Sequence, residues 1–434
     1  MHLISDIEVG AIPDYKPFRS FAVHEAKMRD SETSRRVEPE PSASILARRH
    51  FNGLAFLSAG FRPFFWGAGL WAVISMGIWL LVLNEQMEAP VHFDMVAWHA
   101  HEMLFGFASA AMAGFLLTAV PNWTGRLPVR GFALAGLAGI WLAGRAAMLF
   151  GAYLGNWLAG GIDLSFLAIF FAFIMREILI GKNWRNLPVA AVLFVFLAAN
   201  LTMHLDNAGV LESDGAGWRL GIMTIIMLMS LIGGRITPSF TRNWLAKSGM
   251  EARPAGFGWP DKAALAATGA AALFWVVTPD LAVTGGLLAT AAGLQLFRLS
   301  RWCGYRTFKE PLVLVLHVGY AWIPAGLALL GVSILADLLP FRDALHGLTI
   351  GAVGTMIVAV MTRASLGHSG RPLTAGWGTS VVYLLVIAAV ITRILAMAGT
   401  ESYMLHINVS GFEWIAAFVL FLTLYSPLYF RKRR

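Results

Sequence analysis

The chain has 434 residues, of which 57% are hydrophobic and only 13% are charged. Soluble domains carry about 25% charged residues, so this composition excludes an ordinary soluble protein and indicates a membrane protein. The formal net charge is +8, which in a membrane protein is typical of loops that set topology and not of a nucleic-acid-binding surface. We therefore expect the lipid bilayer as a partner and no nucleic acid.

The chain contains one cysteine, Cys303. A single cysteine excludes an internal disulfide, the Cys-x-x-Cys-His attachment site of c-type haem and a thiolate zinc cage. Any metal bound here must therefore use histidine, methionine or carboxylate ligands.

Residues 1–52 are polar and charged and contain no long apolar run. They lack the short apolar region behind a basic start that marks a secretory signal. We expect a flexible cytoplasmic tail over residues 1–52, followed by an all-α, polytopic transmembrane helix bundle over residues 53–434.

An apolar run of about 20 residues crosses a bilayer as one helix. By that measure the sequence predicts about twelve transmembrane helices. Their ranges are Pro63–Leu83, Trp98–Val120, Val129–Phe150, Leu158–Ile180, Pro188–His204, Leu220–Ile236, Pro260–Thr278, Leu281–Leu299, Leu312–Ala336, Ala344–Ala364, Gly376–Met397 and Phe412–Tyr429.

The loops between these helices alternate in charge. Basic loops such as Arg298–Lys309 and the end of the chain, Arg431–Arg434, are separated by acidic or weakly charged loops such as Glu85–Asp94 and Asp206–Asp214. Cytoplasmic loops are rich in Lys and Arg, so this alternation predicts that both termini are cytoplasmic.

The second predicted helix begins with the motif Trp98–Met103, which holds two imidazoles, a carboxylate and a thioether. Such side chains are costly in a bilayer and by default mark a functional site. His99 and His101 are about 200° apart around a helix and should face opposite ways. By helical spacing we expect Glu102 and Met103 on the face of His99.

Other polar residues are predicted at two depths. His204, His346, Arg145 and Arg393 should lie near the outer face with the motif, whereas His317 and His368 should lie near the inner face. His346 and His368 are 22 positions apart on nearly one helix, about 33 Å, so they cannot share a metal. We interpret His92 and His406 as solvated residues of outer loops.

A haem needs imidazole ligands, an apolar slot and cations for its propionates. His99 or His101, together with His346, could supply the ligands, and Arg145 and Arg393 the cations. Copper would suit imidazole and thioether donors, including Met103. Alternatively, the histidines are packing residues, and the arginines pair with Glu102, Asp163 or backbone carbonyls.

Several ordered motifs resemble the NnrS family. They are Gly60–Phe65, Trp98–Gly106, Pro121–Arg126, Gly233–Pro238, Leu316–Tyr320 and Met361–Arg371. The resemblance covers nearly all of the chain after residue 50. It implies a bacterial inner-membrane protein of about twelve helices that contains haem b and copper and acts in the response to nitric oxide.

The candidate metal ligands are therefore His99, His101, Met103, His204, His317, His346 and His368, and the candidate haem-binding residues are His99, His101, His346, Arg145 and Arg393, with Glu102 beside them. The leading hypothesis is a haem- and copper-containing protein that binds or processes nitric oxide or iron-nitrosyl species in denitrification or nitrosative stress.

Two alternatives stay open. One is a transporter of copper, haem or a small anion, for which helix breaks near Gly60–Pro63 or Thr237–Pro238 would suit alternating access. The other is a haem-dependent oxidoreductase that acts on nitric oxide and takes electrons from quinol or a periplasmic donor. A binuclear reductase of the haem–copper oxidase kind is disfavoured, because the paired-histidine motifs of those enzymes are absent.

Overall fold

The computed structural model describes residues 51–336, 338–399 and 401–431. Almost all of the predicted tail, residues 1–52, lies outside this part. The described residues form helices, turns and loops and contain no strand, which confirms the all-α prediction.

Within the described residues, eleven helices are long and apolar enough to cross a membrane. The protein is therefore a multi-pass membrane protein surrounded by a lipid bilayer. A helix forms at each of the twelve predicted places. The seventh, α11 (Trp259–Val277), falls short of the apolar measure because Asp261 and Lys262 lie in its first turn. The other uninterrupted helices are α2 (Phe61–Leu83), α5 (Phe132–Leu149), α7 (Asn156–Ile180), α8 (Leu187–Asn207), α12 (Ala282–Ser300), α13 (Pro311–Ala336), α16 (Trp377–Leu395) and α17 (Tyr403–Phe430).

Every fourth helix is interrupted by a π-helical segment. The second, sixth and tenth helices consist of α3 (Met95–His101), η2 (Glu102–Ala108) and α4 (Ser109–Thr124); α9 (Ala216–Leu228), η4 (Met229–Gly233) and α10 (Gly234–Lys247); and α14 (Phe341–His346), η6 (Gly347–Gly354) and α15 (Thr355–His368). Such segments occur frequently at functional sites. These three helices are also the most enclosed, with 78%, 67% and 67% of their apolar windows buried.

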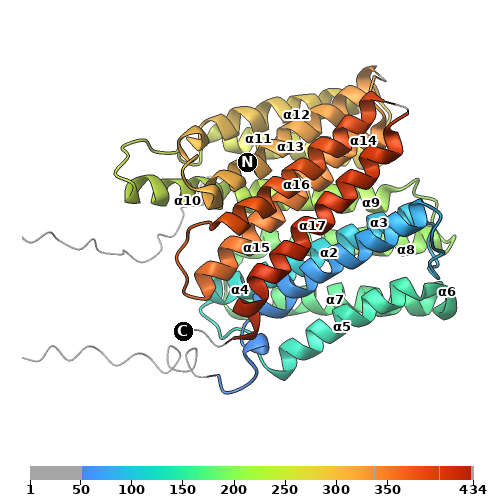
Figure 1. Cartoon of the computed structure of the whole chain (residues 1–434), viewed down its shortest axis with the longest axis horizontal. Helices are drawn as coiled ribbons and strands as arrows, with labels where there is room; N and C mark the ends of the chain where they lie inside the picture. Colours follow the sequence, from blue (N-terminus) through green and yellow to red (C-terminus); the bar gives the residue numbers. More distant parts are fainter. Residues whose placement is uncertain (1–50, 337, 400, 432–434) are drawn as a thin grey trace, which may run out of the picture. The chain divides into compact units, whose positions relative to one another are not determined.

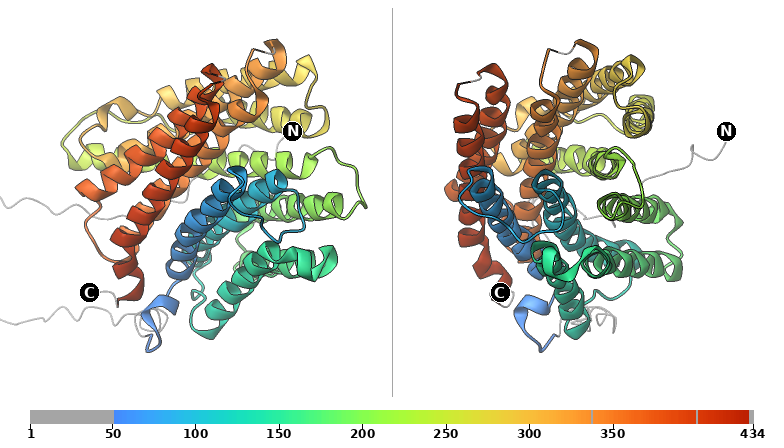
Figure 2. Two further views of the ribbon diagram at one scale, coloured as in Figure 1. Left: turned by 45° about the vertical axis from the view of Figure 1, so that its right-hand side comes forward. Right: turned by 90° about the vertical axis from the view of Figure 1, so that its right-hand side faces the viewer.

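The packing explains why these three helices are enclosed. Helix α17 packs against both α2 and α16, as Figure 1 shows, and so brings the end of the chain beside the first helix. Figure 2 shows α5 beside α7, and α11, α12 and α13 as successive neighbours. Between these outer helices, α15 packs against α4, and α9 contacts η2 and η6. The interrupted helices therefore lie against one another in the interior.

Four helices begin at least three residues earlier than the hydrophobic runs predict. Asp94 caps α3, because its Oδ1 accepts hydrogen bonds from the backbone nitrogens of Val96 and Ala97, at 3.0 Å each. Such a cap supplies acceptors for otherwise unpaired amides and starts the helix at a defined residue. Helices α9, α14 and α17 also start three or more residues before the predicted one. Because α17 begins at Tyr403, His406 lies in a helix, and its placement in a loop was wrong.

Neither predicted helix break is present. Pro238 lies inside α10 without ending it, and Pro63 lies in the first turn of α2, where a proline ring is tolerated. In the described part of the chain, the irregular segments that interrupt the spans are the three π segments.

Candidate functional site

A buried charged cluster joins four helices at the predicted outer end of the bundle. We call it the outer polar network, and its members are His101, Glu102, Arg145, Asp163, Asn200 and His204. Each of these residues is less than 10% exposed. Polar groups at such depth must find partners within the protein, because no water is at hand to solvate them.

Arg145, on α5, bridges two carboxylates from different helices. Its Nη1 donates to both oxygens of Glu102, at 2.7 and 2.6 Å, and its Nη2 is paired with Asp163 Oδ1. This geometry matches the alternative that the sequence left open, in which Arg145 pairs with Glu102 or Asp163. The guanidinium holds α5, η2 and α7 together.

Two imidazoles meet the free side of Asp163. His101 Nε2 lies 3.2 Å from Asp163 Oδ2 and 2.8 Å from Asn200 Oδ1, and His204 Nε2 donates to the same Asp163 oxygen at 3.1 Å. One ligand atom from each of His101, Asp163 and His204 lies within 4.8 Å of the others. This buried group could hold a metal ion, because two nitrogens and one carboxylate oxygen are donors that zinc and copper accept.

The remaining nitrogen of His101 also has a partner. Its Nδ1 donates to Glu102 Oε1 at 2.9 Å. A histidine that binds a metal through one nitrogen typically donates the other N–H to a carboxylate, which fixes the ring. Glu102 is therefore placed to orient His101, and His101 Nε2 is the atom that faces the metal group.

The position of Glu102 differs from the prediction. Helical spacing placed Glu102 on the face of His99, but its carboxylate lies with His101. Glu102, the first residue of η2, follows His101 directly, and its carboxylate turns to the Nδ1 of that ring and to the Arg145 guanidinium. Trp141 Nε1 donates to the carbonyl oxygen of Gly106 in this segment, at 3.0 Å.

His99 belongs to a second cluster, on the opposite face of α3, as predicted. Its ring stacks on Trp79 of α2 with 4.7 Å between centroids, and its Nδ1 is buried and has no hydrogen-bond partner in the described residues. His99, His346 and Arg393 lie within electrostatic range of one another. We call His99, His346 and Arg393 the His99 cluster.

His346 is oriented by its own helix. Its Nδ1 lies 2.6 Å from the carbonyl oxygen of Arg342, which can only accept, so Nδ1 carries the proton and Nε2 keeps its lone pair for a ligand. Arg393 is paired with Asp343, which also accepts a hydrogen bond from the Tyr403 hydroxyl at 3.1 Å.

The structure thus divides the predicted site residues into two groups at one end and leaves others apart. Met103 packs against the apolar core. His317 lies in α13, where its Nε2 is 2.7 Å from Thr241 Oγ1, and the ring of His368 is 5.6 Å from that of Phe61. His317 lies near the start of α13, and His368 ends α15, 22 positions after His346. That these histidines lie at two depths of the membrane stays a prediction.

Sequence reasoning missed the central roles of Asp163 and Asn200 and misplaced His92. A carboxylate and an amide inside apolar helices were the available signal. His92 is not a solvated residue, because both its ring nitrogens are buried and its ring stacks on that of His204 with 6.3 Å between centroids. Burial, followed by the nearby His204 and His101, lowers the pKa of His92 to about 4, so the ring is neutral at pH 7.

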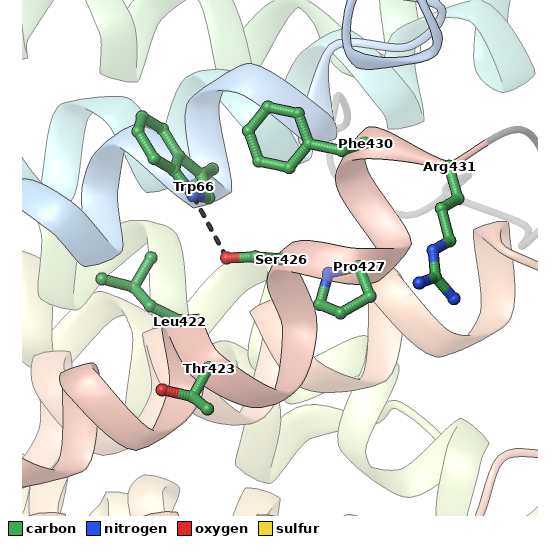
Figure 3. Close-up of a pocket in the computed structure, with 7 residues that line it drawn as sticks. All are labelled: Trp66, Leu422, Thr423, Ser426, Pro427, Phe430 and Arg431. Atoms are coloured by element: carbon green, nitrogen blue, oxygen red, sulfur yellow. Dashed lines mark hydrogen bonds between the residues drawn. The ribbon is translucent and has the colours of Figure 1, made fainter.

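A separate groove lies between α2 and α17, where α2 begins and α17 ends. It has a volume of about 490 Å³ and is lined by Trp66, Leu422, Thr423, Ser426, Pro427, Phe430 and Arg431. Figure 3 shows the hydrogen bond that crosses it, from Trp66 Nε1 to Ser426 Oγ at 3.2 Å. The groove contains no histidine and is distinct from both clusters.

Comparison with known proteins agrees with the motifs in the sequence. No curated protein matches the chain. The family model described as NnrS protein matches residues 55–433, which include every helix named above. The chain therefore belongs to the NnrS family.

Proposed function

We propose that this protein is a bacterial inner-membrane protein that holds haem b and copper and binds or processes nitric oxide or iron-nitrosyl species. Three observations support the proposal. They are the family membership, the buried His101–Asp163–His204 group and the His99 cluster on the opposite face of the same helix.

The His99 cluster has the chemistry that a haem requires. His99 and His346 come from two different helices and lie within electrostatic range of each other, and each ring has one nitrogen that no other group of the described chain engages. Arg393 lies beside them as a cation for a propionate. A haem held there would supply an iron centre that takes up nitric oxide. The protein's part is to present two imidazoles and to enclose the site with apolar helices.

The His101–Asp163–His204 group suits the copper. It offers two imidazole nitrogens and one carboxylate oxygen, and Glu102 orients the first imidazole. Arg145 holds the neighbouring carboxylates in place through its two ion pairs.

One observation carries the proposal. His99 and His101 are two residues apart on α3, yet they belong to two different clusters whose other members come from five further helices. This single helix therefore places a candidate haem ligand beside a candidate metal ligand, an arrangement that packing alone does not require.

The absorption spectrum of the purified protein, with and without nitric oxide, tests the proposal. We expect a Soret band that shifts when nitric oxide is added and that is lost in His99→Ala and His346→Ala. His368→Ala, at the other end of the tenth helix, is the matched control and should keep the band. Protein made in haem-replete cells without a Soret band would end the proposal.

The same material separates the two alternatives. An oxidoreductase would show quinol-dependent loss of nitric oxide in membranes, and this loss would be absent in His99→Ala. A transporter would show uptake of copper, haem or a small anion into proteoliposomes, with metal content that varies with loading.

A further inference from the structure

His92 is an unusual residue of the loop between α2 and α3. Both of its ring nitrogens are buried, and neither has a hydrogen-bond partner in the described part of the chain. A neutral imidazole has one N–H donor and one acceptor, and buried groups of this kind are nearly always paired. An imidazole with both nitrogens unpaired therefore points to a bound group that the polypeptide itself does not supply.

The ring lies at the edge of the His101–Asp163–His204 group. It is nearly parallel to the ring of His204, with an interplanar angle of 13°, and it interacts electrostatically with all three members of the group. Phe93 packs edge-on against both His101 and His204, with 5.4 Å between centroids in each case. The orphan imidazole therefore lies beside the candidate ligands, outside the 4.8 Å within which the ligand atoms of those three residues lie.

The position of the His92 ring is built into the fold. The loop is tied to α6 (Gly151–Leu154) by a hydrogen bond from the backbone nitrogen of Ala152 to the carbonyl oxygen of Pro90, at 2.9 Å. A Cβ atom on Gly151 would lie 1.9 Å from His92 Nδ1, so any larger residue there would occupy the place of the ring. The imidazole of His92 therefore fits in this position only because residue 151 is a glycine.

We propose that His92 is the fourth ligand of the metal centre formed by His101, Asp163 and His204. The inference rests on the metal site of the proposed function and extends it by one residue. Three imidazole nitrogens and one carboxylate oxygen form a donor set for a late first-row transition-metal ion in a four-coordinate site.

The origin of the four ligands also assigns them different tasks. Three of them come from helices α3, α7 and α8, whereas His92 comes from a loop at the predicted outer end. Loops open more readily than the helices that they connect. His92 is thus the proposed ligand that a loop, and not a membrane-spanning helix, positions.

Cobalt(II) titration of the full-length protein in detergent, after removal of metal with a chelator, tests this inference. The wild type should bind one Co²⁺ with the intense visible bands of a four-coordinate site. His92→Ala should weaken binding by about 10- to 100-fold and reduce the band intensity. Gly151→Ala should do the same while the imidazole is retained, because the added methyl group displaces the ring.

Two variants serve as controls. Gly161→Ala, on α7, adds a methyl group where nothing lies within 4 Å. His406→Ala removes another histidine of the same end, whose Nδ1 donates to the carbonyl oxygen of Ser402 at 2.8 Å. Both should bind Co²⁺ as the wild type does. If either test variant does not fold, the other decides the question, and His92→Gln replaces His92→Ala.

Wild-type affinity and band intensity in both His92→Ala and Gly151→Ala would overturn the inference. If binding is also lost in His204→Ala, the metal site stands without His92, and only this inference fails. A wild type that binds no Co²⁺ would remove the inference and the copper part of the proposed function together. The Soret band is measured separately and would still report on haem.

Discussion

The ion pairs of Arg145 allow a quantitative test of the outer polar network. The Arg145 side chain is only 1% exposed and makes three contacts with two carboxylates that are themselves 1% exposed or less. In Arg145→Gln, Glu102 and Asp163 remain buried without their cation. Breaking a buried pair by removing one partner costs about 3–5 kcal/mol, so we expect a loss of that size in the free energy of unfolding.

Equilibrium unfolding in mixed micelles of SDS and a mild detergent measures this loss. Arg126→Gln is the matched control, because Arg126 also pairs with a carboxylate, that of Glu177, but its side chain is 35% exposed. Exposed pairs are worth about 1 kcal/mol or less. Adding Glu102→Gln and Asp163→Asn to Arg145→Gln should restore part of the stability, because no buried charge then lacks a partner.

The result that refutes this reasoning is a loss of less than about 1 kcal/mol in Arg145→Gln, equal to that in Arg126→Gln. It would mean that water or a bound ion already compensates the two carboxylates, and that the guanidinium does not hold α5, η2 and α7 together.

Three further predictions follow from individual contacts. Gly106→Ala places a methyl group 2.7 Å from Nη1 of Arg145 and should lower the unfolding temperature. Gly136→Ala, with nothing within 4 Å of the added methyl group, should leave the unfolding temperature unchanged or raise it slightly. Equal effects of the two substitutions would contradict the close packing at η2. Asp94→Ala removes the cap of α3 and should cost about 1 kcal/mol in unfolding free energy. It should also weaken haem retention and metal binding, whereas Asp94→Asn should keep the cap and both kinds of binding. Unchanged haem retention and metal binding in Asp94→Ala would refute the link between this cap and the two clusters. Arg298 has a fully buried guanidinium, whose Nε donates to Asp261 Oδ1 at 2.8 Å. Asp261→Asn leaves this guanidinium without its anion. It should cost about 3–5 kcal/mol in the same micelle assay, and a loss below about 1 kcal/mol would show that other groups satisfy that cation.

Much of the fold follows from the sequence because the bilayer imposes a simple rule. A chain in hydrocarbon must satisfy its backbone hydrogen bonds within each segment, so apolar runs of sufficient length become helices. The twelve runs are all helical for this reason. The errors in the predicted helices lie at the helix ends, as at His406, because polar residues continue a helix beyond the apolar run from which it is predicted.

Part of the site also follows from helix geometry. An offset of two residues turns a side chain by about 200°, so His99 and His101 had to face different neighbours. The different positions of His346 and His368 along one helix followed in the same way from their separation in the sequence. These conclusions depend on a single helix and its direction, which the sequence contains.

Only the tertiary structure decided which residues contact those histidines. Asp163 and Asn200 join His101 because α7 and α8 turn their polar faces toward α3, and no local pattern specifies which helices become neighbours. The carboxylate of Glu102 lies with His101 and with Arg145 of α5, a partner that helical spacing along α3 does not reveal. Helix formation is a local property of the chain, whereas the two clusters exist only because helices distant in sequence pack together, and that packing decides which polar groups become partners.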